Sequence, residues 1–234
     1  MALDAKRQTI FAGVNYVFAP APVLDSETFL KFKSVLARHG LAFDQSNQSA
    51  SEGWALARAK PPLRVQVRLP AQPLGQVMVT SDWMEQDLAA FVDEAAIVSD
   101  AVFEVWPGDK QVVSRDATIR QLYDAGGIPA FSYLWERRLG QQKEQLAFLQ
   151  RPVSGGGLRL MMPPEPADPD PVQGEVKIES FLRDPRKLFV EVSFLWPKPE
   201  PPVGQFQPKV LLVEVENFAN SDVYEFLMLK GGSK

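Results

Sequence analysis

Few side chains in this sequence have the type and spacing that catalysis requires. His39 is the only histidine among the 234 residues, and it directly precedes Gly40 at the expected end of a helix. At a helix C-terminus a donor or cation satisfies terminal carbonyl groups, so a capping role is favoured over that of a catalytic base. A metal site made of several histidines is excluded, and no Gly-x-Ser-x-Gly motif accompanies His39.

Carboxylates offer a second candidate chemistry. Asp93 and Glu94 lie near Asp87 and Asp100 in the sequence, and Asp93 shares a helix face with Asp100. Such groups could act as general acids and bases or bind a hard cation. An apolar stripe at helical spacing runs through the same segment, which favours a solvated face for the carboxylates instead. The sequence therefore indicates no catalytic residue and no metal ligand, and a carboxylate-dependent enzyme is kept as an alternative.

The composition excludes several other kinds of site. The chain has no cysteine, which rules out disulfides, thiolate–zinc sites, iron–sulfur clusters and cysteine nucleophiles. The glycine run at 155–157 precedes an expected strand and not a helix, so it indicates a hinge or tight turn and not a phosphate cradle. We therefore expect no cofactor.

One group of candidate binding residues is basic and aromatic. Trp54, Arg58, Arg64 and Arg68 fall on neighbouring expected strands, where a polyanion such as a nucleic acid could lie across the sheet. Alternatively, these residues belong to an ordinary solvated sheet face, where charges prevent unwanted pairing of strand edges. The net charge of −4 argues against a broad nucleic-acid footprint. Nucleic-acid binding is therefore the weaker reading of this patch.

A second group lies in the acidic, proline-rich segment 163–171. Its five prolines lack the amide donor that a sheet ladder needs, so the segment is expected to be an extended, solvated arm. Pro166, Asp168 and Asp170 are the candidate binding residues on this arm. The segment 197–202 is expected to form a second proline-rich connector.

The elements that must position these residues follow two periodicities. Residues 9–19 alternate like a strand, and Asn15 interrupts the apolar run that a signal peptide would need. Alternation predicts further strands at 53–58, 63–69, 76–82, 158–162, 175–182 and 187–195. Helical spacing predicts helices at 26–39, 84–103 and 208–228, a short helix at 119–124, and an interrupted helix at 129–151. Residues 44–52 are expected to form a polar loop, and 231–234 a flexible tail.

The chain also repeats itself. Residues 64–83 align without gaps to residues 177–196, and the matched pairs include Val65 with Ile178, Val77 with Val190, Val79 with Val192 and Trp83 with Trp196. A duplicated unit keeps its packing anchors, so both tryptophans are expected in the core. The sequence thus predicts an α+β protein of two tandem related units in a pseudo-twofold arrangement, each an antiparallel β-meander packed against a long helix.

The expected organisation divides the chain into three parts. Residues 1–108 form the first α+β unit, 109–152 a helical connector or the diverged start of the second unit, and 153–234 the second unit with its proline-rich loops. No run of about 18 apolar residues is present, so we expect no insertion into a membrane. The lack of cysteine fits a cytoplasmic location.

These features favour a non-enzymatic binding or assembly protein that acts through sheet surfaces, sheet edges and proline-rich arms. We expect a protein partner or a larger assembly. The alternatives are a small-molecule or lipid binder with a cavity between sheet and helix, the carboxylate-dependent enzyme and, more weakly, nucleic-acid binding through Arg58, Arg64 and Arg68. The ligand, the partner and the oligomeric state are left open.

Overall fold

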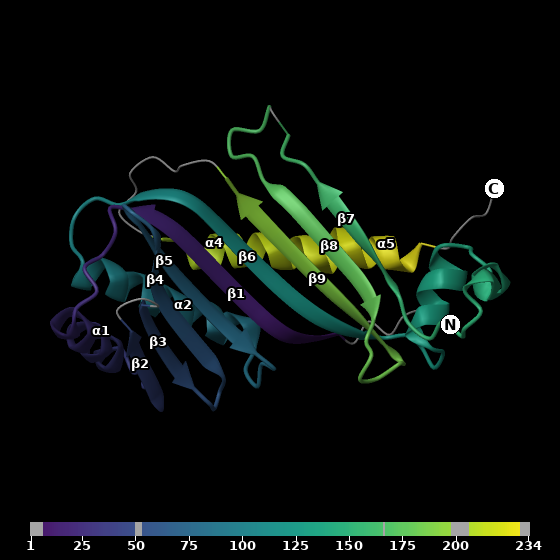
Figure 1. Cartoon of the computed structure of the whole chain (residues 1–234), viewed down its shortest axis with the longest axis horizontal. Helices are drawn as coiled ribbons and strands as arrows, with labels where there is room; N and C mark the ends of the chain where they lie inside the picture. The colour runs from purple at the N-terminus through teal and green to yellow at the C-terminus, as the bar shows by residue number, and fades with distance from the viewer. Residues whose placement is uncertain (1–6, 50–52, 166, 198–205, 230–234) are drawn as a thin grey trace.

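The computed structural model describes residues 7–49, 53–165, 167–197 and 206–229. They form a mixed α+β structure with one large antiparallel sheet and five α-helices (Figure 1). The strands are β1 Arg7–Ala19, β2 Gln45–Ser49, β3 Gly53–Arg58, β4 Leu63–Ala71, β5 Leu74–Asp82, β6 Gln111–Asp124, β7 Gly157–Met162, β8 Gln173–Ser180 and β9 Lys187–Trp196. The helical segments are α1 Ser26–Arg38, α2 Leu88–Val105, α3 Ala130–Ser132, η1 Tyr133–Arg138, η2 Lys143–Leu149, α4 Pro208–Phe218, η3 Ala219–Val223 and α5 Tyr224–Met228.

The sheet has nine strands in the order β2-β3-β4-β5-β1-β6-β9-β8-β7. Its two longest strands, β1 and β6, lie next to each other near the middle, with Gly13 opposite Thr118. β1 also pairs with β5, and β6 also pairs with β9. The β1–β6 pair therefore joins an N-terminal group of strands to a C-terminal group in one continuous sheet.

Alternation along β1 and β6 explains why both strands fit the centre of the sheet. Ala12, Val14 and Tyr16 are buried on one face of β1, and Ala117 and Ile119 are buried on the same face of β6. Successive strand residues point to opposite faces, so the residues between them point to the other side. One face of each strand is thus apolar and packs in the core.

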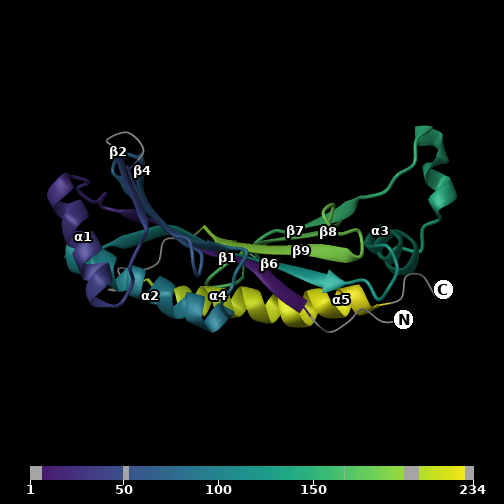
Figure 2. The same cartoon turned by 90° about the horizontal axis from the view of Figure 1, so that it is seen from below.

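Helices cover this apolar face. α2, α4 and α5 run along one side of the sheet, and α1 packs against α2 at one end (Figure 2). Each helix turns an apolar stripe inward, as amphipathic helices do. The stripes comprise Phe29, Phe32, Val35 and Leu36 of α1, Phe91, Ala95, Val98 and Val102 of α2, and Leu211, Leu212 and Val215 of α4.

The first helix begins and ends as its sequence predicts. Asp25 is the N-cap, its side chain accepts a hydrogen bond from the Thr28 amide at 2.7 Å, and the Thr28 hydroxyl accepts from the Asp25 amide. These reciprocal bonds satisfy amide groups that the first helical turn leaves unpaired. His39 is the C-cap residue, and its amide donates to the carbonyls of Val35 and Leu36. The predicted capping position of His39 is confirmed.

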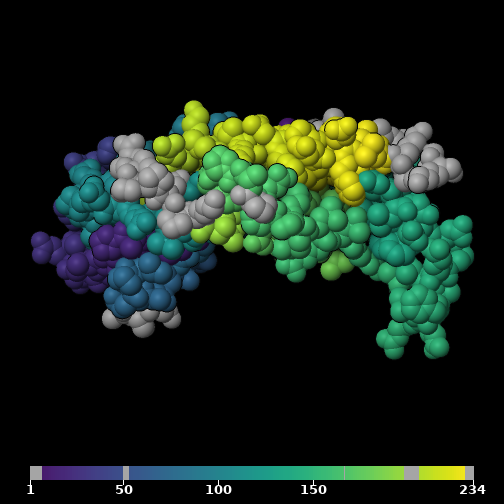
Figure 3. All heavy atoms as spheres, turned by 90° about the horizontal axis from the view of Figure 1, so that it is seen from above, coloured from purple at the N-terminus to yellow at the C-terminus, as the bar shows by residue number. Residues whose placement is uncertain are grey.

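No described helix covers the opposite face of the sheet. The ends of β2–β4 and the helical arm around η2 project from this side (Figure 2). The space-filling view shows a hollow between these two projections (Figure 3). The molecule thus has one face closed by helices and one face, here called the open face, that lies between two projecting ends.

The short helix predicted at 119–124 is wrong. These residues belong to β6, where Ile119 pairs with both Ala12 and Val192. The buried positions Ala117, Ile119, Gln121 and Tyr123 follow a period of two, which is the period of a strand. The apolar residues of this short segment also fit the spacing of a helix. The segment is a strand because it pairs with β1 on one side and with β9 on the other.

The loop predicted at 44–52 is also wrong in part, because β2 pairs with β3 along its length. All five of its residues are polar, and it has one strand neighbour, so no apolar alternation marks it in the sequence. The interrupted helix predicted at 129–151 is present only as the short segments α3, η1 and η2. The helix predicted at 208–228 is confirmed, with a π-helical turn, η3, between α4 and α5.

The two equivalent tryptophans differ. Trp196 is buried in the core, whereas Trp83 is about half exposed, with a backbone φ of 51°. Trp83 lies beside the β8–β9 turn, where its ring is 6.2 Å from that of Phe181 and Arg183 lies over it. The expectation that both tryptophans anchor the core is therefore right for Trp196 and wrong for Trp83.

The central position of β6 predicts the effect of one substitution. Ile119→Ala should lower the free energy of unfolding by about 2–5 kcal/mol, because it leaves a cavity under the middle of the sheet. Leu182→Ala, in the exposed β8–β9 turn, is the control and should change it by less than about 0.5 kcal/mol. Urea denaturation followed by circular dichroism measures both values. Equal stabilities of the two variants would contradict the placement of β6.

Candidate functional site

A row of paired charges crosses the open face. On β7 and β8, Arg159 donates to Glu175 at 2.7 Å, and Lys177 lies 3.2 Å from the same carboxylate. Lys177 also donates to Glu191 of β9 at 2.5 Å, and Glu191 accepts a further bond from Arg120 of β6 at 2.5 Å. We call these five residues the charge ladder. It links four neighbouring strands through alternating signs of charge.

The pKa values of the ladder follow from its pairing. Burial works to raise the pKa of Glu191, but hydrogen bonds from Lys177 and Arg120 outweigh it and hold that pKa below the ordinary value. The hydrogen bond from Arg159 lowers the pKa of Glu175, and the bond to Glu191 raises that of Lys177. All three groups are therefore held in their charged forms near neutral pH.

The ladder ends on an aromatic ring near the centre of the sheet. The guanidinium group of Arg120 lies 4.2 Å from the ring centre of Phe11 on β1. Next to it, Gly13 makes room for this ring, because a Cβ built on Gly13 would come within 2.9 Å of Phe11. A cation over an aromatic face is favourable, and more so when water is excluded.

A second polar row crosses the sheet beside the first. Gln76 of β5 donates to Asn15 of β1 at 2.9 Å, and Asn15 donates to Asp116 of β6 at 2.6 Å. Burial raises the pKa of Asp116, while the bond from Asn15 acts in the opposite direction. Between the two rows, the hydroxyl groups of Thr118 and Ser193 lie 2.8 Å apart. Satisfied polar side chains therefore occupy the centre of the open face.

The predicted basic and aromatic patch is divided between the two faces. Trp54 is buried on the helix-covered side, with its ring 5.2 Å from those of Phe29 and Trp106. Arg58 is on that side too and donates to Glu94 of α2 at 2.6 Å. Arg64 and Arg68 are exposed on the open face. The sheet itself thus separates residues that the sequence placed in one group.

The acidic proline-rich segment is tied to the sheet at one point. Asp170 forms an ion pair with Arg115 of β6, whose side chain is 6% exposed and lies over the Trp196 ring. Asp168 accepts a hydrogen bond from the Asp170 amide at 2.9 Å. Pro166 lies outside the described residues. Most described residues of the segment are exposed, as expected for a solvated arm, but this ion pair fixes one end of it to the sheet.

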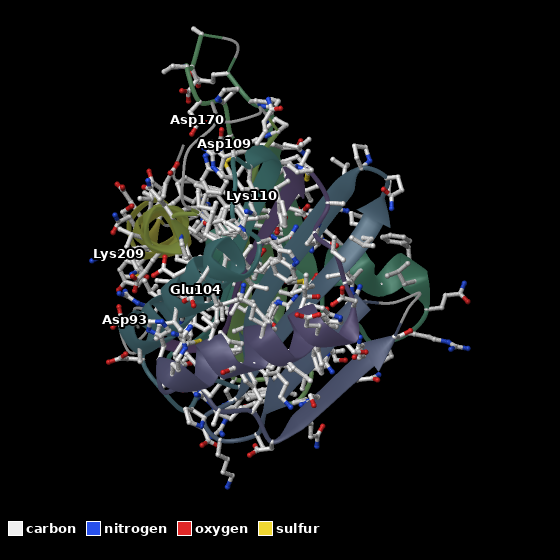
Figure 4. All side chains as sticks on the ribbon, turned by 90° about the vertical axis from the view of Figure 1, so that its left-hand side faces the viewer. Asp93, Glu104, Asp109, Lys110, Asp170 and Lys209 are labelled. Carbon is white, nitrogen blue, oxygen red and sulfur yellow. The ribbon has the colours of Figure 1, made fainter. Side chains whose placement is uncertain are left out.

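The candidate carboxylates of α2 do not converge. Asp93 lies on the exposed side of α2, far from Asp170 on the proline-rich segment (Figure 4). Glu94 is occupied by Arg58 and by Gln86, whose amide donates at 2.9 Å. Asp87 is the N-cap of α2 and accepts from the Ala90 amide. Capping and ion pairing account for Asp87 and Glu94, as expected for a structural role.

Sequence reasoning missed the main polar residues of the open face. Arg120 was assigned to a helix, and no local motif connects it with Glu191 or Lys177. The buried amine of Lys110 was missed as well; it donates to the carbonyls of Trp106 and Gly108 after the end of α2, and burial lowers its pKa. Strand alternation gave the only usable sign of the open face, since it places Lys177 on the other face of the strand from the buried Val176 and Ile178.

Comparisons with known proteins do not assign this arrangement: no family model, no curated protein and no solved structure matches the chain. Within the described residues, no group of three or more acidic or histidine side chains is placed to hold a metal ion. No helix in the same part of the chain combines the length and apolar character needed to cross a membrane.

The charge ladder predicts a pH-dependent contribution to stability. Glu191→Gln should lower the free energy of unfolding by about 1–3 kcal/mol at neutral pH, because Arg120 and Lys177 lose a charged partner. A carboxylate with a lowered pKa stabilises the fold above its ordinary pKa, which is 4.5, and this stabilisation is lost as the pH falls through the lowered value. The difference between wild type and variant should therefore shrink in acid.

Urea denaturation at a series of pH values measures this difference. Glu179→Gln is the matched control, since Glu179 is exposed on the neighbouring strand β8. It should change stability by less than about 0.5 kcal/mol at every pH. A Glu191→Gln effect that stayed constant from neutral pH into acid would show that the ladder charges do not contribute.

Proposed function

We propose that this is a non-enzymatic binding protein that receives a protein partner on the open face of its sheet. The observation that carries the proposal is the shape of that face. Helices α2, α4 and α5 lie along one side of the nine-stranded sheet, and the other side is a hollow between two projecting ends (Figures 2 and 3). A rigid sheet with a wide uncovered face suits recognition more than catalysis, which needs converging reactive groups.

The charge pattern favours a protein over a nucleic acid as the occupant. Arg64 and Arg68 are balanced on the open face by Asp82, Asp116 and Glu179, and the ladder residues pair with one another. A polyanion binds by displacing counterions from a continuous basic surface. Alternating charges with half-buried apolar side chains between them instead match the mixed surface of a protein.

The edge of the sheet offers a second contact for the same partner. β7 is the last strand in the order, so one row of its backbone groups has no strand neighbour in the described part of the chain. Its side chains include Leu160 and Met161, which are 38% and 51% exposed, and its one charge, Arg159, is paired with Glu175. Such an edge can accept an added strand, because β7 contains no proline and its single charge is already paired.

We also propose that the sheet consists of two related units in a pseudo-twofold arrangement. β5, β4 and β3 follow β1 on one side, as β9, β8 and β7 follow β6 on the other. The strand registers agree when Gly13 of β1 is matched with Thr118 of β6. Buried residues then coincide at Ala12 with Ala117, Val14 with Ile119, Val77 with Val190 and Val79 with Val192.

The same registers refine the alignment made from sequence. Following the pairing across each hairpin matches Val65 with Val176 and not with Ile178, because the β8–β9 connection is the longer one. β2 then has no counterpart beyond β7. The exposed edge of β7 is the position where the second unit is one strand short. Residues 109–152, proposed as the diverged start of that unit, contain β6. A cytoplasmic location stays a prediction.

Site-specific photo-crosslinking tests the binding proposal. A photoreactive phenylalanine analogue replaces Met78 of β5 or Leu195 of β9, which point to the open face, or Leu30 of α1 and Val213 of α4, which are exposed on helices. After irradiation in the native host, both open-face positions should give crosslinks to the same protein, and the helix positions should not. Mass spectrometry identifies the crosslinked chains.

The outcome that would overturn the proposal is equally specific. Crosslinks from Leu30 or Val213 with none from Met78 and Leu195 would place the partner on the helices. Absence of any protein crosslink from the open face would remove the proposed function. Circular dichroism of each variant shows whether it has folded.

A further inference from the structure

A pocket of about 410 Å³ lies on the side of the sheet that the helices cover, away from the open face. Its apolar part is formed by Met162 at the end of β7, Phe194 of β9 and Phe218 at the end of α4. Gly174 of β8 lies beneath Met162 and Phe194, since a Cβ built there would come within 2.4 Å of the Met162 methyl group. The size falls in the range of small-molecule sites in proteins.

Carboxylates surround this apolar floor. Glu165 and Asp168 come from the proline-rich segment, Glu214 from α4 and Asp222 from η3. No lysine, arginine or histidine is among the described lining residues, and none of these four carboxylates belongs to an ion pair in the described part of the chain. The lining of the pocket therefore carries negative charge without a cation of its own, although the positive charge of Arg115 reaches Glu214.

The pKa of Glu214 lies above its ordinary value. Burial raises its pKa first, and the negative charges of Asp170 and Asp168 raise it further, while Arg115 acts in the opposite direction. Asp222 accepts a hydrogen bond from the Ser221 hydroxyl at 2.6 Å. A cation in the pocket would be attracted by the carboxylates of its lining.

Two local features fix the walls of the pocket. The ion pair between Asp170 and Arg115 holds one end of the proline-rich segment against the sheet. The π-helical turn η3 interrupts the α4–α5 helix at the residues that line the other wall, Ser221 and Asp222. Single π-helical turns inside α-helices are frequent at functional sites, because they move side chains out of the regular helical position. Both walls are thus built from irregular segments.

We propose that this pocket binds a small organic cation, in which a primary amine is carried on an apolar body. The apolar body would lie against Met162, Phe194 and Phe218, and the ammonium group would face the carboxylates. A bare metal ion would leave the apolar floor without a partner, and a neutral or anionic ligand would leave the carboxylates uncompensated. This site lies on the other side of the sheet from the protein-binding face, and its function does not depend on that proposal.

Methionine-methyl NMR tests the assignment directly. The full-length protein is labelled at its methionine methyl groups and titrated with phenethylamine, and in parallel with 2-phenylethanol, which has the same apolar body and no charge. The amine should produce a saturable shift of the Met162 resonance, and the alcohol should bind at least about fivefold more weakly. Met78, on the open face, reports any binding outside the pocket.

Two variants separate the pocket from the rest of the helix. Glu214→Gln keeps the shape of the side chain and should weaken amine binding by about two- to fivefold, as expected for a partly exposed ion pair. Glu216→Gln, on the same helix and outside the pocket, should leave it unchanged. The far-ultraviolet circular dichroism of each variant confirms that it is folded.

Three results would overturn this inference. The first is no saturable shift at Met162 with the amine. The second is equal binding of the amine and the alcohol, which would show an apolar slot without charge recognition. The third is unchanged amine binding by Glu214→Gln, or an equal loss in Glu216→Gln.

Discussion

The antiparallel pairing of β1 with β6 is the interaction on which both faces of the molecule depend. Each of these strands has a second strand neighbour on its outer side, so their backbone donors and acceptors are satisfied within the sheet. Their buried residues form the floor on which α2 and α4 lie side by side. The same alternation sends Asn15, Asp116 and Arg120 to the opposite face. One pairing thus determines both the core and the open surface.

The sequence predicted elements wherever one period was clear. The strands at 63–69 and 187–195 and the capped helix at 26–39 alternate or repeat without ambiguity, and all three are confirmed. β6 was missed at 119–124 because the apolar residues of so short a segment fit the period of a helix as well as that of a strand. Only pairing with distant strands decides that the segment is a strand. β2 was missed because a polar edge strand has no apolar face to mark it.

The candidate sites were harder to predict than the elements. Arg58 and Arg64 are close in sequence, but strand alternation and the strand end place them on opposite sides of the sheet. Conversely, Arg120 and Glu191 are 71 positions apart and meet only because β6 and β9 are neighbours. Asp168 was a candidate only because the segment 163–171 is acidic and rich in proline. In the structure, Asp168 and Glu214 of α4 line the same pocket. Contacts between distant segments, which no local motif records, create these sites.

Native-state hydrogen exchange followed by mass spectrometry tests most directly whether one sheet supports the whole molecule. Backbone amides that are hydrogen-bonded between the central strands of a cooperative sheet exchange only when the whole protein unfolds. We predict that peptides from β1 and β6 exchange slowest and at the same rate, and that urea raises both rates together. Fast exchange in β6 while β1 and β5 stay protected would show two independently folding parts, and would contradict the central role of the β1–β6 pair.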